Sequence, residues 1–168
     1  DLRSSVLYDL ARYPESEASE REVLALYRRL HGKRSRDEVV TLSDLAMSLQ
    51  AQTRVDEAVG LLRESIRLGL LLGEDAAQDV AWSRSDLGYL LYQKGAWSEA
   101  VEVLNLALDA QRRLIPDDNI ELAGSLNNLG GLYVELEQYD QAERLLTEAL
   151  DMYRRIYGGR HPAIARRT

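Results

Sequence analysis

Three aromatic residues, Trp82, Tyr89 and Tyr92, are the side chains of this sequence with the clearest capacity for chemistry. Their spacings of seven and three residues place them along one side of a helix, where the rings can form a single surface. Trp and Tyr dominate the energetics of binding surfaces because each buries a large rigid ring and still offers a hydrogen-bond donor. This group therefore predicts the non-covalent recognition of a partner.

Residue types that catalysis and metal binding need are scarce. The sequence contains no Cys, which excludes disulfides, thiolate nucleophiles and Cys-ligated zinc, and it contains only two His residues. It has no Gly-rich loop before a basic residue, no nucleophile motif and no spacing typical of metal ligands. We therefore expect a protein that is not an enzyme and that uses no catalytic residue, no metal and no cofactor.

The overall composition is that of a globular protein. Of the 168 residues 45% are hydrophobic, and 28 Asp and Glu against 21 Lys and Arg give a formal charge of −7. Nucleic-acid binding needs an excess of cations, so this acidic balance argues against it. The sequence has neither a run of about 18 apolar residues nor a charged-then-apolar start. We expect a reducing, cytoplasmic compartment, no nucleic-acid partner and no membrane contact.

The sequence repeats itself with a step of 42 residues. Aligned without gaps at this step are Leu45, Leu87 and Leu129; Ala58, Ala100 and Ala142; and Leu62, Leu104 and Leu146. Leu30, Leu72, Leu114 and Ile156 carry the register through four units, and 168 residues are four such periods. Self-similarity at a fixed period indicates a repeat architecture.

Each unit has the spacing of two helices joined by a short turn. In the unit from residue 121, apolar residues recur at threes and fours, first over 122–136 and again over 142–153. A polar break at 137–138 separates the two stripes. The last turn position carries a side-chain oxygen in three units, and we expect these residues to cap the second helices: Asp56, Ser98 and Asp140.

The period alone does not identify the family, because HEAT and armadillo repeats also have periods near 42 residues. The residue types at fixed positions do distinguish these families. The series Leu129-Gly130-x-x-Tyr133, Ala142, Leu146 and Ala149 resembles the tetratricopeptide signature of large, small and aromatic positions. The units are about eight residues longer than the usual ~34. Together with Asn127-Asn128, Tyr139-Asp140-x-Ala142 and Gly158-Gly159-Arg160-His161-Pro162, this length resembles the kinesin-light-chain type of repeat. The resemblance implies an all-α fold, a right-handed α-solenoid of antiparallel helix pairs with about four repeats.

We expect a single array over residues 1–168. It comprises a degenerate first repeat (1–36), three full repeats (37–78, 79–120 and 121–162) and the start of a further helix (163–168). In the first repeat Ser16, Ser19 and Glu20 stand at apolar positions, so this repeat is either a cap whose polar residues face water or the edge of a longer array. We expect the chain to be an excerpt of a longer protein.

The resemblance implies that first helices line a concave groove. The peptide-binding residues expected there are Ser43, Asp44 and Met47; Trp82, Ser85, Asp86, Tyr89 and Tyr92; and Asn127, Asn128 and Gly131. The concave positions, which also include Gly124 and Glu135, contain no Lys or Arg, so we expect a neutral to acidic groove. For Trp82 two interpretations stay open: it lines the binding surface, or it packs against the preceding first helix.

The acidic groove bears on the partner. Tetratricopeptide domains that hold acidic chaperone tails use Lys or Arg side chains to clamp a carboxylate. Kinesin light chains bind peptides in which Trp is flanked by acidic residues, which also calls for basic groove walls. The expected groove positions of this sequence carry no such basic residues. We expect a non-catalytic protein–protein interaction module of a scaffold or signalling protein that binds a basic or apolar extended segment. The alternative is a structural spacer or self-association element that forms homodimers through its exposed array ends.

Overall fold

The computed structural model describes residues 2–31, 35–115 and 117–158, and in this part of the chain all regular structure is helical. The α-helices are α1 (Leu2–Asp9), α2 (Tyr13–His31), α3 (Arg36–Ala51), α4 (Val55–Leu72), α5 (Ala77–Gln93), α6 (Trp97–Leu114), α7 (Ile120–Glu135) and α8 (Tyr139–Tyr157). A short 3-10 turn, η1 (Gly73–Ala76), joins α4 to α5. The expected all-α fold is confirmed.

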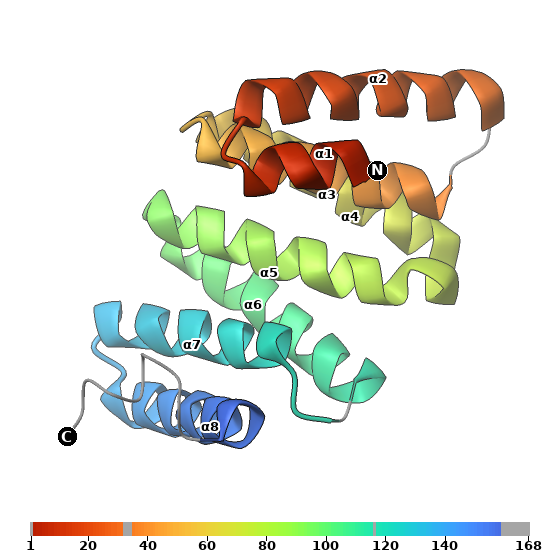
Figure 1. The fold of residues 1–168 in the computed structure, drawn as a ribbon. Helices are drawn as coiled ribbons and strands as arrows, with labels where there is room; N and C mark the ends of the chain where they lie inside the picture. Colours follow the sequence, from red (N-terminus) through yellow and green to blue (C-terminus); the bar gives the residue numbers. More distant parts are fainter. Residues whose placement is uncertain (1, 32–34, 116, 159–168) are drawn as a thin grey trace.

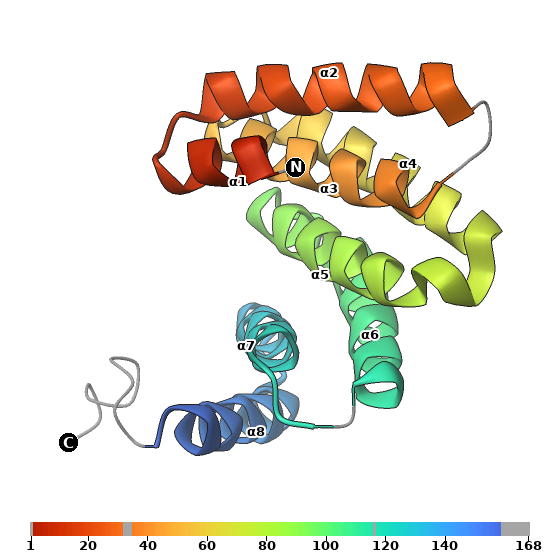
Figure 2. The same cartoon turned by 45° about the vertical axis from the view of Figure 1, so that its right-hand side comes forward.

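Consecutive helices pair antiparallel, and each pair packs on the next. The pairs are α1–α2, α3–α4, α5–α6 and α7–α8, and they contact one another through α2 and α3, α4 and α5, and α6 and α7. Figures 1 and 2 show the pairs turning progressively along one curved stack, which is the expected α-solenoid. The further helix expected at 163–168 lies outside the described residues.

A left-handed residue closes the first helix of every pair. These residues, each 42 positions from the next, have φ angles of 56° to 74°: Ala11, Thr53, Gly95 and Glu137. In the second pair the Thr53 N–H donates to the Gln50 carbonyl and the Arg54 N–H donates to the Leu49 carbonyl, both at 2.9 Å. These two bonds make a Schellman turn. The repeat in sequence is thus also a repeat in backbone conformation.

The expected side-chain caps of the second helices are wrong. The helices α4, α6 and α8 begin one residue before Asp56, Ser98 and Asp140. Their N-cap residues, Arg54, Ala96 and Gln138, make no side-chain cap hydrogen bond. The Schellman turn is the reason, because the chain leaves the left-handed residue and enters the next helix after a single further residue. Asp56 and Asp140 instead lie in the first helical turn, where the helix dipole favours negative charge.

Small residues let the two helices of a pair approach closely. A Cβ atom on Gly88 would lie 2.4 Å from Leu104 Cγ, and one on Gly130 would lie 2.7 Å from Leu146 Cγ. Ala46 holds the same position in α3 and is fully buried. A small residue at Gly88 and Gly130 is therefore required by the close helix crossing.

Of the two interpretations of the first repeat, the one in which Ser16, Ser19 and Glu20 face water is wrong. Ser16, Ser19 and Glu20 are all buried. The Glu20 Oε1 atom accepts hydrogen bonds from Ser16 Oγ (2.9 Å) and from Ser48 Oγ of α3 (3.0 Å). Burial raises the pKa of Glu20 above its usual range. These polar residues form an internal contact between α2 and α3, which is why apolar side chains are not needed there.

Candidate functional site

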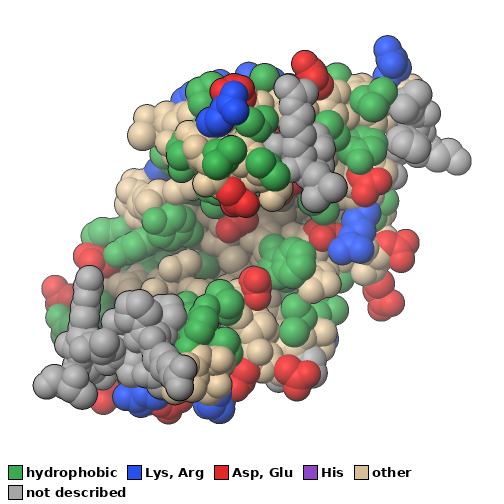
Figure 3. All heavy atoms as spheres, in the orientation of Figure 1, with side chains coloured by type: hydrophobic (Ala, Val, Ile, Leu, Met, Phe, Trp, Pro, Cys, Tyr) green, Lys and Arg blue, Asp and Glu red, His purple; other side chains and the backbone are tan. Residues whose placement is uncertain are grey.

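The row of first helices is hollowed between α5 and α7. The hollow has a volume of about 480 Å³ and is lined by Trp82, Ser85, Asp86, Tyr89, Gln111, Glu121, Gly124, Ser125 and Asn128. Figure 3 shows this face of the molecule, hollowed at its centre, with acidic and hydrophobic side chains around the recess. The structure thus brings together five of the expected site residues: Trp82, Ser85, Asp86, Tyr89 and Asn128.

Two buried polar atoms belonging to residues of the hollow have no hydrogen-bond partner among the described residues. They are the donor Nε1 of Trp82 and the acceptor Oε1 of Gln111. Gln111 comes from α6, is 1% exposed, and donates from Nε2 to Ser85 Oγ at 3.0 Å. Burying a polar atom without a partner costs about 1–3 kcal/mol. An unsatisfied donor and acceptor on two residues that line one recess favour a ligand that supplies both complements, provided that the side chains turn toward it.

Trp82 lies partly buried at the wall of the hollow. Its indole is half-buried, its nitrogen is wholly buried, and the side chain still lines the hollow. Tyr89, two helical turns after Trp82 on α5, lines the same recess. Its hydroxyl accepts a hydrogen bond from Gln93 Nε2 (2.8 Å). The aromatic surface is therefore partly packed and partly presented.

Asp86 carries the strongest electrostatic perturbation in the hollow. Burial, and to a smaller extent the charge of Asp44 on α3, together raise the pKa of Asp86 to about 6. Burial also raises the pKa of Asp44, although its side chain reaches solvent, because the surrounding helices reduce its hydration. The lining contains a second carboxylate, Glu121, and no Lys or Arg. Asp86 is thus partly dehydrated and faces no cation from the lining.

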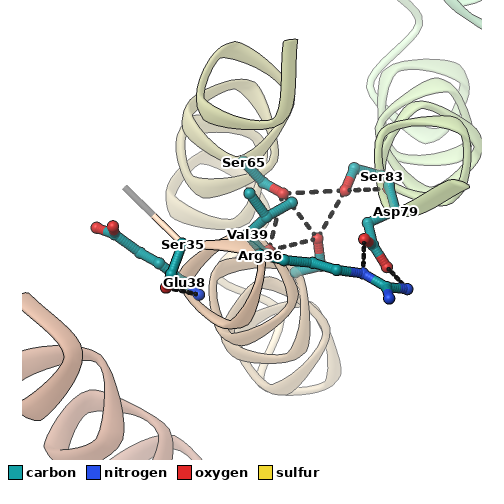
Figure 4. Close-up of polar contacts among 8 residues, drawn as sticks. Ser35, Arg36, Glu38, Val39, Ser65, Asp79 and Ser83 are labelled. Carbon is teal, nitrogen blue, oxygen red and sulfur yellow. Dashed lines mark hydrogen bonds and ion pairs between the residues drawn. The ribbon is translucent and has the colours of Figure 1, made fainter. Parts of the chain in front are cut away.

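The equivalent junction between α3 and α5 is joined by polar contacts. The hydroxyls of Ser43, Ser65 and Ser83 hydrogen-bond to one another at 2.7 to 3.0 Å. Beside them Arg36 donates from Nε and Nη2 to the carboxylate of Asp79, at 2.5 and 3.2 Å. Figure 4 shows the two sets of contacts joining α3, α4 and α5. Ser43, which was expected to bind peptide, is part of this internal network.

Residues 42 positions apart show how the two junctions differ. Gln78 stands where Arg36 stands one unit earlier, while Glu121 keeps the carboxylate of Asp79. Gly124 of α7 stands where α5 carries Trp82, and a Cβ on Gly124 would meet nothing nearer than the Tyr153 hydroxyl at 3.9 Å. The α5–α7 junction therefore retains an acidic side chain but lacks both the arginine and the side-chain volume.

Models of one protein family match most of the chain. Models described as tetratricopeptide repeat match residues 2–70, 38–113 and 122–163. The chain belongs to the tetratricopeptide repeat family. The expectation drawn from the Leu129-Gly130-x-x-Tyr133 series is thereby confirmed.

Solved structures of tetratricopeptide-like repeats share this fold. A putative kinesin light chain with nearly identical TPR-like repeats from Podosopora anserina has a TM-score of 0.67 at 20% identity, over 91% of this chain and 72% of that one. A point variant of that protein gives 0.70 at 19% identity, over 92% and 73%. BtubC (BKLC) from P. vanneervenii gives 0.64 at 17% identity, over 95% and 80%. No curated protein sequence matches the chain.

Tetratricopeptide repeats generally mediate protein–protein interactions and are typically non-catalytic. Within residues 2–31, 35–115 and 117–158, no three His, Asp or Glu side chains gather as a metal site would require. No helix in that same part of the chain has the length and apolar character needed to cross a bilayer.

The other expected site residues of this tetratricopeptide array lie outside the hollow. Tyr92 packs against the hydrophobic core, and Met47 is half-buried on α3. Asn127 is exposed, and the space around Gly131 is open, because nothing lies within 4 Å of where its Cβ would stand. They neighbour the hollow on α3, α5 and α7 without lining it.

Sequence reasoning missed Gln111, Glu121 and Ser125. Gln111 lies on a second helix, and second helices were expected to form the outer face. The available signal was its register, because Gln111 aligns with Gly69 in a helix otherwise rich in apolar core positions. An amide at a buried helical position needs partners, and its sequence neighbours offer none.

Proposed function

We propose that this protein binds an extended segment of a partner protein along its first helices, with the hollow between α5 and α7 as the main contact, and that it catalyses no reaction. The observation that carries the proposal is the pair of buried, unpartnered atoms, Trp82 Nε1 and Gln111 Oε1, in one recess. Such atoms are stabilised when a ligand accepts from the first and donates to the second.

An extended peptide supplies both kinds of group. Its backbone offers a carbonyl that can accept from the indole N–H and an N–H that can donate to the glutamine oxygen. A hollow of about 480 Å³ has room for one large side chain. The neighbouring first helices continue the surface on both sides, so a chain that enters the hollow can run on across α3 and α7.

The charges of the hollow favour a basic or apolar partner. Asp86 and Glu121 line it, Asp44 lies on the adjacent α3, and no lining residue is cationic. An acidic tail would bring like charges together in a partly dehydrated recess, which costs free energy. A carboxylate clamp of the kind found in other tetratricopeptide domains is therefore not proposed.

Tryptophan fluorescence tests this proposal. Trp97 is 39% exposed at the start of α6 and does not line the hollow, so a Trp97→Phe variant reports on Trp82 alone. Titration of that variant with pools of extended peptides is expected to shift the emission of Trp82. In the parent chain, Trp82→Phe keeps the aromatic bulk but removes the N–H, and we expect about tenfold weaker binding. Unchanged emission and no measurable binding with acidic, basic and apolar pools would contradict the proposal.

Self-association is the second candidate, and the α7–α8 end of the stack supports it. Val134 and Tyr139 are 43% and 62% exposed there, and together with Ala142 and Leu146 they line a second recess of about 440 Å³. An exposed apolar end of a repeat array favours stacking on another copy. Sedimentation velocity over a concentration series tests this candidate: a dimer that Tyr139→Glu dissociates supports it, and a monomer throughout rejects it.

A further inference from the structure

We infer that the hollow between α5 and α7 takes the guanidinium group of an arginine side chain from the bound segment. This inference rests on the proposed function, and it names the side chain that the site selects. It is carried by three observations: the register of the two junctions, the carboxylates of the hollow, and the aromatic and amide groups that surround them.

The molecule itself shows how an arginine satisfies this position. At the α3–α5 junction, Arg36 makes two hydrogen bonds to Asp79, which is 4% exposed. One unit later Glu121 holds the Asp79 position, but Gln78 replaces the arginine. No ion pair to Glu121 is found among the described residues. The second junction therefore keeps the acceptor of an arginine contact and has lost the donor.

The carboxylate at the floor of the hollow strengthens this demand for a cation. Asp86 is partly buried and has no hydrogen-bond or ion-pair partner within the described chain. The groups that face it are acidic or neutral: Asp44 on α3, Tyr8 on α1, and across the hollow Glu121 on α7. A cation placed between the partly buried Asp86 and the exposed Glu121 would be attracted by both carboxylates, most strongly on the side of Asp86, which is less hydrated.

Arginine fits the remaining groups better than lysine does. Its planar guanidinium carries five donors, so it can pair with a carboxylate through two of them and still donate to the unpartnered Gln111 Oε1. It also stacks on aromatic faces and is more weakly hydrated than an ammonium group, which suits a wall formed by Trp82 and Tyr89. An apolar side chain would leave Asp86 and Gln111 dehydrated and unsatisfied.

Binding of a cation is linked to protonation of Asp86. With a pKa of about 6 in the free protein, the carboxyl is mostly ionised at pH 7.5 and mostly protonated at pH 5. A guanidinium contact favours the ionised form, so we expect the affinity to fall by up to about tenfold from pH 7.5 to pH 5. The arginine stays protonated throughout this range, so the change reports on the protein.

The direct experiment is isothermal titration of the full chain with four pools of seven-residue peptides, capped at both ends. The central position is Arg, citrulline, Lys or Leu, and the other positions are randomised among small neutral residues. We expect the Arg pool to bind about tenfold more tightly than the citrulline pool, which has the same shape without the charge. Equal affinity for all four pools would overturn the arginine inference and leave the proposed function standing. Binding by none would overturn both.

A matched pair of variants locates the contact. Asp86→Asn is expected to remove most of the preference for Arg over citrulline and to abolish the pH dependence. Asp109→Asn makes the same charge change on α6, in a separate groove between α6 and α8, and is expected to leave both unchanged. Circular dichroism controls for folding. An Arg preference that survives in folded Asp86→Asn, or that both variants lose equally, would overturn the assignment.

Discussion

The α3–α5 and α5–α7 junctions are formed by the same register positions of the repeat, but their side chains make different contacts. In the first, Arg36 pairs with Asp79 and three serine hydroxyls join the helices. In the second, the serine contact is kept, as Ser85 and Ser125 lie 2.8 Å apart, but the arginine is gone and Gly124 replaces a bulky residue. The carboxylate remains, now facing an open recess.

This difference shows how one junction of a repeat array can change without a new element. The helices, turns and close crossings repeat at both junctions, since these depend on the left-handed turn residues and on small residues such as Gly88 and Gly130. Between the two junctions the side chains at several register positions differ: Gln78 and Gly124 remove an arginine and a bulky side chain, while Trp82 and Gln111 add polar groups that have no partner. The groups thereby become available to a partner.

The largest expected effect comes from breaking the ion pair at the α3–α5 junction. Arg36→Gln leaves the nearly buried Asp79 without its cation, and we expect the free energy of unfolding to fall by about 2 kcal/mol, less than for a fully buried pair because Arg36 is itself 55% exposed. Urea denaturation measures the loss. The double variant Arg36→Gln/Asp79→Asn is the control and is expected to recover most of it. An unchanged stability in the single variant would mean that the two junctions do not differ in the way described.

The next effect tests whether the hollow holds an unsatisfied charge. Because the pKa of Asp86 is raised to about 6 in the folded protein, the folded state binds the proton more tightly than the unfolded state does. Stability therefore falls as the pH rises from about 4 to about 6 and stays lowered above that. We expect Asp86→Asn to add about 1–2 kcal/mol at pH 7, since Asp86 is only partly buried, and nothing at pH 4. Destabilisation at pH 7 would show that the carboxylate has a structural role.

The smallest expected effects come from substituting two glycines, one at a packed helix crossing and one beside the open hollow. Gly88→Ala places a Cβ 2.4 Å from Leu104 Cγ, and we expect a net loss of about 1 kcal/mol after the gain in helix propensity. Gly124→Ala finds only the Tyr153 hydroxyl, at 3.9 Å, and we expect a gain of about 0.5–1 kcal/mol. Thermal unfolding of the two variants side by side is the measurement. If both changed stability with the same sign, the contrast between a packed crossing and an open hollow would be wrong.

The sequence was sufficient for the fold and for half of the site. Periodicity depends on local apolar spacing, so the 42-residue step and the helix pairs are visible without coordinates. Five lining residues on α5 and α7 followed from the family resemblance, which implies that first helices line the groove. The prediction of side-chain caps was wrong because backbone hydrogen bonds of the turn set where the second helix begins, and the residue types of Asp56 and Ser98 do not reveal them. The buried Ser16 and Glu20 could not be foreseen, since their partner Ser48 lies on another helix. Gln111 was missed because its role depends on how far α6 reaches into the recess.

The most direct test of the account is to return the missing arginine. Gln78→Arg places a guanidinium where Arg36 stands one unit earlier, next to Glu121 instead of Asp79. The account predicts that this variant binds the arginine-centred peptide pool at least about tenfold more weakly than the parent chain, while its thermal stability rises. Gln141→Arg, on α8 in the groove away from the hollow, is the matched control and should bind as the parent does. Equal affinity of folded Gln78→Arg and the parent chain would contradict the central claim that the hollow lacks, and therefore recruits, an arginine.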